Sequence, residues 1–464
     1  MVLPPEVVEL IDSLRREIEA LRAENAELRR RLDLDSSNSS KPPSSDGLKK
    51  KPRVLKSLRT RTGKPSGGQK GHRGDTLRQV AEPDAIVEHA AEVCEHCQAR
   101  LPADSKVDEE TRQVFDLPQK PLTVTEHRAA VHDCPACGLR TRADFPEGVV
   151  SPAQYGERVK AAAIYLNAQQ LVPEERTAQV LQDLFGAAAC GASVAAWVRR
   201  KAEALGPVHH GIGVCVAAAP VRCLDETGFR IAGATRWLHT ASTLTHTFYR
   251  AAVPRSAVPE FEGGVVVHDH WRAYYSLENV DHAFCNAHLL RELQAVCELD
   301  REPWAEALRT TLLDANEAVQ AAKAQGASAL PAETIKAFED RYWAAVREGL
   351  DLHRSLPAFD PSTNPKKRKK QRPAHNLLIR FKTFKAATLR FLTDFTVPFT
   401  NNLAEQDLRM MKVKIKISGG FRTLQGAADF ASLRSVISSA RKQSLNILKA
   451  LTLGPERLAV ELKL

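Results

Sequence analysis

The chain has 464 residues, of which 43% are apolar and 26% charged, and it carries a net charge of +10. This length exceeds what one hydrophobic core usually supports, so the composition predicts about two to four domains of an ordinary water-soluble class. No apolar run approaches the roughly 20 residues that cross a bilayer, and the first residues lack a signal-peptide pattern. These features argue against a membrane protein and predict a cytoplasmic one.

The first 35 residues have the pattern of a coiled coil. Two series of residues recur every seven positions, offset from each other by three: Ile11, Ile18, Asn25 and Leu32, and Val7, Leu14, Leu21 and Leu28. Ile mostly at a, Leu mostly at d and a single Asn at a favour a parallel two-stranded coil. Residues 1–35 are therefore predicted to be a dimerising coiled coil, detached from the rest by the Ser-rich segment that follows. A single amphipathic helix packed on its own domain is the alternative.

The positive charge is concentrated in the next segment. Twelve Lys or Arg and two Asp lie between Lys41 and Arg78, so this stretch accounts for the whole net charge. Residues 36–80 are rich in Ser, Pro, Gly and Lys, which predicts a disordered basic linker that cannot bury a core. A mobile basic arm is typical of nucleic-acid binding, although a solvated run that only keeps the chain soluble has the same composition.

Residues 81–150 contain two Cys-x-x-Cys pairs, formed by Cys94 with Cys97 and by Cys134 with Cys137. Four thiolates in two such pairs can close a tetrahedral zinc site that stabilises a small domain. Strand-like segments at 111–117 and 124–132 predict a ribbon between the pairs. The nine cysteines of the chain thus fit structural zinc in a reducing compartment better than disulfides, and a redox dithiol is the weaker alternative.

Residues 151–210 are helical in pattern. Two short helices, beginning near Pro173 and Ala192 and separated by a Gly-containing turn, are compatible with a helix-turn-helix. Two short helices with a glycine between them also occur in any helical domain.

Short apolar strands begin near residue 214, and two of them are followed by aspartates. Strands are predicted at 221–224, 228–232, 236–241, 245–251, 263–269 and 282–286, with the stretch 271–277 between the last two and a helix from about 287. This succession predicts an α/β domain with a mixed sheet. Asp225 and Asp269 end two of these runs, so adjacent strands would bring both carboxylates to one edge of the sheet. Glu226 would point to the opposite side if its strand continues.

Helices are predicted over 298–395, interrupted by the basic run 366–372, and again after Asn401. Either Asn401 or Asn402 can cap the helix that carries Glu405. Two strand-borne aspartates and a helix-borne glutamate suit a two-metal phosphoryl-transfer site, although each acid alone is more often a cap or turn residue. A strip of cations follows Glu405 and is predicted to bind DNA: Arg409, Lys412, Lys414, Lys416 and Arg422.

Further histidines and a cysteine lie near these acids: His268, His270, Cys285 and His288. A second metal site is one interpretation of this set. Hydrogen-bonding neighbours that form a structural clamp beside the acids are the favoured one, because Cys285-x-x-His288 has no obvious second pair. Trp271 and Tyr274 fit a core better than a base-stacking platform.

At this point the chain resembles the transposases of the insertion sequence 66 family over nearly its full length. The shared motifs follow one another in order: Ser-Ser-x-Ser-Ser-Lys-Pro-Pro-Ser, the two Cys-x-x-Cys pairs, Asp-Glu-Thr-Gly, His-Asp-His-Trp, Cys-Asn-Ala-His-Leu-Leu-Arg-Glu-Leu, Val-Pro-Phe-Thr-Asn-Asn-Leu-Ala-Glu-Gln-Asp-Leu-Arg and Lys-Ile-Ser-Gly-Gly-Phe-Arg. One departure is Gln406, where the family often has Arg, which removes a cation beside Glu405.

The resemblance implies an Asp-Asp-Glu transposase with a ribonuclease-H-like core. It implies that Asp225, Asp269 and Glu405 are the catalytic residues and hold Mg²⁺ (or Mn²⁺). The expected domains are the segments 1–35, 36–80, 81–150 and 151–210, a catalytic core in two parts (211–297 and 396–445) around a helical insertion (298–395), and a tail at 446–464.

The implied activity is metal-dependent cleavage of element ends followed by strand transfer into target DNA. The expected partners are DNA, a second copy of the chain through the coil, and accessory proteins of the same element, in the bacterial cytoplasm at the nucleoid. The main alternative is a non-catalytic zinc-containing DNA-binding protein or an inactivated relative. A ribonuclease is a third, weaker one.

Overall fold

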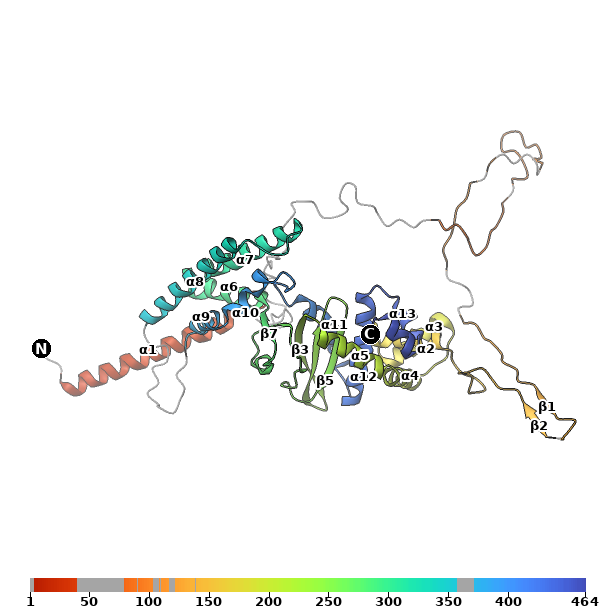
Figure 1. Cartoon of the computed structure of the whole chain (residues 1–464), viewed down its shortest axis with the longest axis horizontal. Helices are drawn as coiled ribbons and strands as arrows, with labels where there is room; N and C mark the ends of the chain where they lie inside the picture. Colours follow the sequence, from red (N-terminus) through yellow and green to blue (C-terminus); the bar gives the residue numbers. More distant parts are fainter. Residues whose placement is uncertain are drawn as a thin grey trace.

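The computed structural model describes residues 4–39, 79–89, 91–102, 108, 110–116, 122–137, 139–356 and 371–464. Figure 1 shows a central sheet with helices at both ends and an N-terminal helix at one side. Most of the basic linker at 36–80, and most of the basic run at 366–372, lie outside the described residues. In the described part, no helix combines the length and apolarity needed to cross a membrane.

A five-stranded mixed sheet forms the centre of the molecule. Its strands are β3 (Val221–Ile231), β4 (Ala234–Ser242), β5 (Thr247–Ala252), β6 (Val265–His268) and β7 (Asp281–Phe284). They lie in the order β5-β4-β3-β6-β7. Neighbours among β3, β4 and β5 are antiparallel, whereas β3 with β6 and β6 with β7 are parallel. The predicted α/β class with a mixed sheet is confirmed.

The sheet region differs from its sequence prediction at β3 and gains a helix after Asp269. β3 runs through the stretch that was predicted as two strands, because all of Cys223–Ile231 pairs with β4. The segment after Asp269, for which the sequence predicted no definite structure, forms a short 3-10 helix, η4 (Arg272–Ser276). Tyr274 in this helix is buried and packs into the core, which stabilises the turn in place of a sheet ladder.

Helices precede the sheet along the chain. They are α2 (Glu157–Ile164), the π-helix η3 (Tyr165–Gln169), α3 (Glu174–Phe185), α4 (Gly191–Ala204) and α5 (Gly206–Ala218). α3 ends at Gly186, whose φ of 70° suits glycine as the residue that terminates a helix. The predicted helical region thus continues through α5, up to β3 of the central sheet.

A bundle of helices is inserted between β7 and the last part of the chain. It consists of α6 (Asn286–Ala295), the π-helix η5 (Val296–Asp300), α7 (Pro303–Ala324), α8 (Ala332–Ser355), α9 (Pro373–Thr383) and α10 (Lys385–Thr393). Its core surrounds Trp304, which is fully buried. A Cβ on Gly349 of α8 would lie only 2.6 Å from a side-chain carbon of Leu378, so the close approach of α8 and α9 requires this glycine.

The chain then returns to the sheet. α11 (Asn402–Ser418) ends at Gly419, and α12 (Leu424–Lys442), α13 (Ile447–Thr452) and α14 (Pro455–Glu461) follow. The last two helices occupy the expected tail at 446–464. Leu451, Leu458 and Leu462 are buried in the main core, so this segment is part of the folded body.

The two faces of the sheet have different covers. Leu224, Ala241 and Val266 face a core that is built with α5, α12, α13 and α14. Cys223 has the opposite orientation on β3 and packs with Ala404 of α11, as expected from the alternation of side chains along a strand. Glu405 therefore follows a residue that is buried directly against the β3 face that carries Cys223.

The N-terminal helix α1 (Pro5–Asp33) lies beside the helical insertion in Figure 1. Its C-terminal end is docked there: Arg30 forms an ion pair of 3.2 Å with Asp300, and the amide of Asn38 donates to Glu298 at 3.2 Å. The expectation that the helix detaches after Asp35 is therefore wrong, because Asn38 is buried against the insertion. Before this docked end, the apolar stripe of α1 that was predicted to pair is exposed: Val7, Leu14, Ile18, Leu21 and Leu28.

Candidate functional site: a carboxylate centre beside a cysteine and a histidine

Asp225 and Asp269 are brought together by the pairing of β3 with β6. Cys223 of β3 lies opposite Val267 of β6, and each aspartate is two residues farther along its own chain. The separation of 44 residues therefore equals the register offset of the two parallel strands. β6 ends before Asp269, whereas β3 continues with β4 as its partner. The sequence had suggested that Asp225 ends its strand, but Asp225 lies within β3.

The environment of these two acids disfavours their ionised forms. Burial raises the pKa of Asp225 to about 8, and the nearby carboxylates of Glu226, Asp269 and Glu405 add to this effect, while Lys412 opposes it. Burial also raises the pKa of Asp269 to about 6, although its carboxylate accepts a hydrogen bond of 2.9 Å from the N–H of Trp271. The acids are therefore close enough to influence one another, in a place that favours neutralisation by a proton or a cation.

Glu405 lies in the first turn of α11, which is fastened to the sheet by Asn401. The side-chain amide of Asn401 donates to the carbonyl oxygen of Leu224 at 2.6 Å, and its backbone N–H donates to the sulfur of Cys285 at 3.1 Å. Asn401 occupies the N-cap position of α11, one of the two that the sequence allowed, but its side chain makes no capping hydrogen bond. Asn401 instead connects three segments beside Asp225: β3, the start of α6 and the start of α11.

A second fastening of α11 involves Asp407. One oxygen of its carboxylate accepts hydrogen bonds from Ser242 (2.6 Å) and Thr247 (2.9 Å) and pairs with Lys442 at 2.9 Å. Both charged side chains of the pair are largely buried. Strands β4 and β5 and helix α12 thereby fix the turn of α11 that follows Glu405.

Glu226 has a different environment from its neighbour Asp225. It accepts two hydrogen bonds from Arg255, at 2.9 and 2.5 Å, and one from the hydroxyl of Tyr274. The guanidinium of Arg255 also lies over the rings of Trp237 and Trp271. Glu226 is therefore bonded on both of its oxygens to its own partners, Arg255 and Tyr274.

The predicted DNA-binding cations divide into two groups. Arg409, Lys412, Lys416 and Arg422 are exposed, and Lys412 acts electrostatically on Asp225. Lys414 is half-buried, with its ammonium group 5.1 and 5.5 Å from the ring centres of Phe421 and Phe430. Its pKa is lowered by burial. The structure thus assigns Lys414 to the packing of α11 and leaves the other four at the surface.

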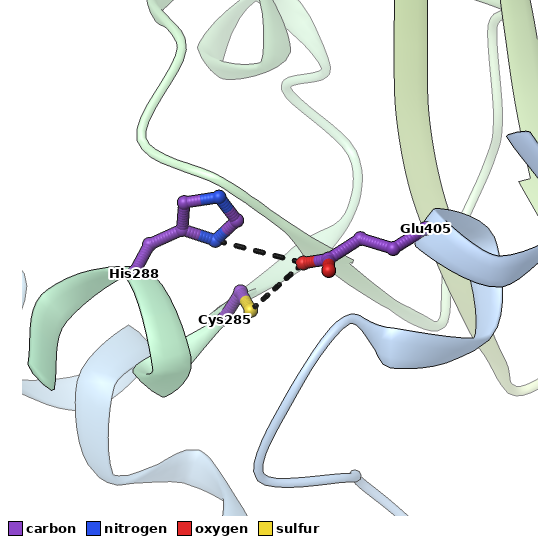
Figure 2. A group of neighbouring side chains, drawn as sticks. All are labelled: Cys285, His288 and Glu405. Carbon is purple, nitrogen blue, oxygen red and sulfur yellow. Dashed lines mark hydrogen bonds and ion pairs between the residues drawn. The ribbon is translucent and has the colours of Figure 1, made fainter. Parts of the chain in front are cut away.

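Figure 2 shows the carboxylate of Glu405 pointing toward the side chains of Cys285 and His288. Its Oε1 atom lies 3.7 Å from the cysteine sulfur and 3.8 Å from Nδ1 of the histidine. Burial raises the pKa of the Cys285 thiol to about 12 and lowers the pKa of His288 to about 4. The other two predicted histidines lie apart: His268 hydrogen-bonds His282, and His270 hydrogen-bonds a tyrosine.

The two cysteine pairs form matching turns in the exposed arm at 79–150. The N–H of Cys94 donates to the carbonyl of Ala99, and that of Cys134 to the carbonyl of Leu139, both at 2.9 Å. Backbone N–H groups within each turn, that of the second cysteine first, lower the pKa of the first thiol, which favours the thiolate form that zinc binds.

The structure does not gather the four sulfurs. Among the described residues, Cys285, His288 and Glu405 form the one group of three or more potential metal ligands within 4.8 Å of one another. The strand content of the arm is also smaller than expected. β1 (Val131–Asp133) and β2 (Arg140–Arg142) form a small ladder around the second pair, and the first pair is flanked by a single bridge. The expected ribbon strands at 111–117 and most of 124–132 are absent from the described part of the arm.

Comparison with protein families supplies the identification. A family model described as the transposase IS66 family matches residues 152–429, which is more than half of the chain. The chain belongs to the IS66 transposase family. A second model, the zinc-finger binding domain of transposase IS66, matches residues 91–138, and a family of unknown function matches residues 3–78. The comparison with curated proteins gives no match.

The family match spans the sheet, the insertion and α11, so it also contains the residues whose contacts sequence reasoning missed. Asn401, Asp407 and Arg255 each connect segments far apart in the chain. Asn401 and Asp407 stand in the same short motif as Glu405, which was the available signal. Nothing local in the sequence points to Arg255.

Proposed function

We propose that this IS66-family protein is the catalytic transposase of its element, which cleaves element ends and joins them to target DNA. The observation that carries the proposal is the pairing of β3 with β6. Asp225 and Asp269 each follow a paired residue of these strands by two positions, and they lie near Glu405. The proposed catalytic set is Asp225, Asp269 and Glu405. The mixed sheet, three antiparallel strands followed by two parallel ones, supports a ribonuclease-H-like core with a helical insertion.

The donor set fits Mg²⁺ or Mn²⁺. Asp225 and Asp269 carry raised pKa values because of burial and of neighbouring carboxylates, and a divalent cation would relieve this repulsion. Carboxylate oxygens are the ligands that hard cations prefer. When bound, such a cation stabilises charge on phosphodiester oxygens and acidifies a water molecule.

The chain's own residues supply the remaining requirements. Asn401 and Asp407 hold α11 so that Glu405 stays beside the aspartates. Arg409 and Lys412, at the fourth and seventh positions after Glu405, lie on the same side of the helix and would bind the phosphates next to the scissile bond. Arg255 keeps the Glu226 carboxylate occupied, so that it does not compete for the cation.

The peripheral segments would bind DNA and a second copy of the protein. Zinc held by Cys94, Cys97, Cys134 and Cys137 would stabilise the arm, as the family match to a zinc-finger domain supports. The exposed stripe of α1, which includes Leu14, Leu21 and Leu28, supports pairing as a coiled coil.

The test is cleavage and joining of labelled element-end DNA by the full chain with Mg²⁺, Mn²⁺ or EDTA. We expect products that depend on the metal and are lost in Asp269→Asn. Asp351→Asn, at an exposed position on α8, is the matched control and should retain activity. Metal-independent DNA binding without products, also after addition of the element's other proteins, would favour a non-catalytic DNA-binding protein instead.

A further inference from the structure

Cys285, His288 and Glu405 offer one sulfur, one nitrogen and one oxygen around a common point. Their donor atoms all lie within 4.8 Å of one another, and they come from the start of α6 and the first turn of α11 (Figure 2). A tetrahedral zinc ion with ordinary bond lengths separates such donors by about 3.3–3.6 Å. The observed separations from Glu405, 3.7 Å to sulfur and 3.8 Å to nitrogen, are close to these values.

One hydrogen bond lies within this group, from the thiol of Cys285 to Oε1 of Glu405 at 3.7 Å, but hydrogen bonding does not account for the position of His288. Nδ1 of His288 is buried and, within the described residues, has no hydrogen-bond partner. Its distance of 3.8 Å from the Glu405 carboxylate is too long for an N–H···O bond. A buried ring nitrogen without a partner is costly, and a cation between it and the carboxylate would satisfy both.

Opposing influences act on the sulfur. In the metal-free protein, burial and the Glu405 carboxylate raise the pKa of the Cys285 thiol, whereas the backbone N–H of Asn401 donates to Cys285 Sγ at 3.1 Å. The N–H of His288 donates to the carbonyl oxygen of Cys285 at 3.0 Å. An N–H group such as that of Asn401 stabilises negative charge on sulfur and holds a metal ligand in place. With the thiol deprotonated the three ligands carry two negative charges, which a divalent ion neutralises, beside the cations Arg291 and Lys412.

We infer that Cys285, His288 and Glu405 form a binding site for a borderline-soft divalent cation of the zinc class, with water in the fourth position. Binding releases the thiol proton of Cys285 to solvent. Sulfur and imidazole nitrogen select Zn²⁺ or Co²⁺ over Mg²⁺, which prefers oxygen alone. The site is separate from the cysteine pairs of the arm.

Glu405 belongs to this site and to the proposed carboxylate centre. Zinc occupancy therefore withdraws Glu405 from the two aspartates, and the zinc-bound protein is the inactive form of the transposase. This consequence rests on the proposed function, whereas the binding site itself does not.

The site is tested by titration of the full chain with Co²⁺ after the arm has been loaded with one equivalent of Zn²⁺. We expect one further Co²⁺ per chain, with a thiolate-to-cobalt absorption band in the near ultraviolet. Cys285→Ser should lose the band and His288→Gln should weaken binding at least about tenfold. Cys297→Ser is the matched control, since its thiol contacts Glu306 instead, and it should keep the band. Absence of a second Co²⁺, or a band that persists in Cys285→Ser, would overturn the inference.

The consequence is tested by adding micromolar Zn²⁺ to Mg²⁺-driven end cleavage. The ratio of the cleavage rate with zinc to the rate without zinc should be about one tenth or less for the wild type. For Cys285→Ser the same ratio should be nearer to one. Equal ratios would overturn the inhibitory role. If the zinc-free wild type shows no cleavage, the proposed function fails, while the Co²⁺ titration still decides the metal site.

Discussion

The carboxylate centre and the cysteine arm of this IS66-family protein both contain predicted metal ligands, yet they are organised in different ways. Around Asp225 the fold positions the acids by strand register and by the contacts of Asn401 and Asp407. In the arm, Cys94 and Cys134 lie in well-formed turns, but the remainder is exposed and the two pairs are not gathered. The core brings its acids together without a metal, whereas the four cysteines proposed to bind zinc are not gathered in the arm. This difference parallels burial, because the core packs its apolar residues in the interior, whereas many large apolar side chains of the described arm are exposed.

The largest expected effect separates two neighbouring acids of β3. Asp225→Asn should reduce end cleavage at least about a thousandfold, since it removes a proposed cation ligand, while leaving the melting temperature unchanged or higher. Glu226→Gln should retain cleavage within about tenfold but lose about 1.5–3 kcal/mol of stability, because it weakens the bonds with Arg255 and Tyr274. Cleavage assays and denaturant unfolding of both variants measure this. Equal loss of activity in the two would refute the division of roles along the strand.

Zinc removal should affect the arm and spare the core. A chelator, or Cys134→Ser, should abolish the protection of amides at 91–138 from hydrogen exchange, while the amides of β3 stay protected. Cys190→Ser, which alters an exposed cysteine outside the arm, is the control and should leave both regions unchanged. Protection of the arm that survives in the zinc-free protein would show that it folds without metal and would remove the contrast with the core.

Loss of Asp407 should destabilise the core strongly. Asp407→Ala leaves Lys442 largely buried without its carboxylate, and removes the acceptor of Ser242 and Thr247. The expected cost is about 3–5 kcal/mol in the free energy of unfolding. Asp351→Ala, which breaks an exposed pair with Arg354, should cost less than about 1 kcal/mol. Urea unfolding decides this, and similar costs for both would mean that α11 is held mainly by apolar contacts.

The smallest expected effect is a pH dependence of stability in metal-free protein. The folded pKa of Asp225 is about 8, above its ordinary value of 3.8, so the native state binds more protons than the unfolded state between these pH values. Stability from this group is therefore present at low pH and declines as pH rises toward 8. The melting temperature of Asp225→Asn minus that of the wild type should increase by a few degrees from pH 5 to pH 8. Saturating Mg²⁺ should abolish most of that increase, and a difference that is flat with pH would contradict the raised pKa.

Local patterns in the sequence predicted much of this protein correctly. The alternation of apolar residues predicted most of the strands, and the helices of the insertion followed from their periodicity. The position of Asp225 and Asp269 after similar apolar runs pointed to adjacent strands, and the pairing of β3 with β6 confirms their adjacency. These features depend mainly on residues close together in the chain, whose side chains set the local preference for a strand, a helix or a turn.

Tertiary structure decided the contacts between distant segments. It placed Cys285 and His288 against Glu405, more than a hundred residues away, and bonded Asn401 to the carbonyl of Leu224. It also docked the end of α1 on the insertion and folded residues 446–464 into the main core. No local pattern encodes these pairings, because they depend on which faces are buried together once all the helices and strands have packed.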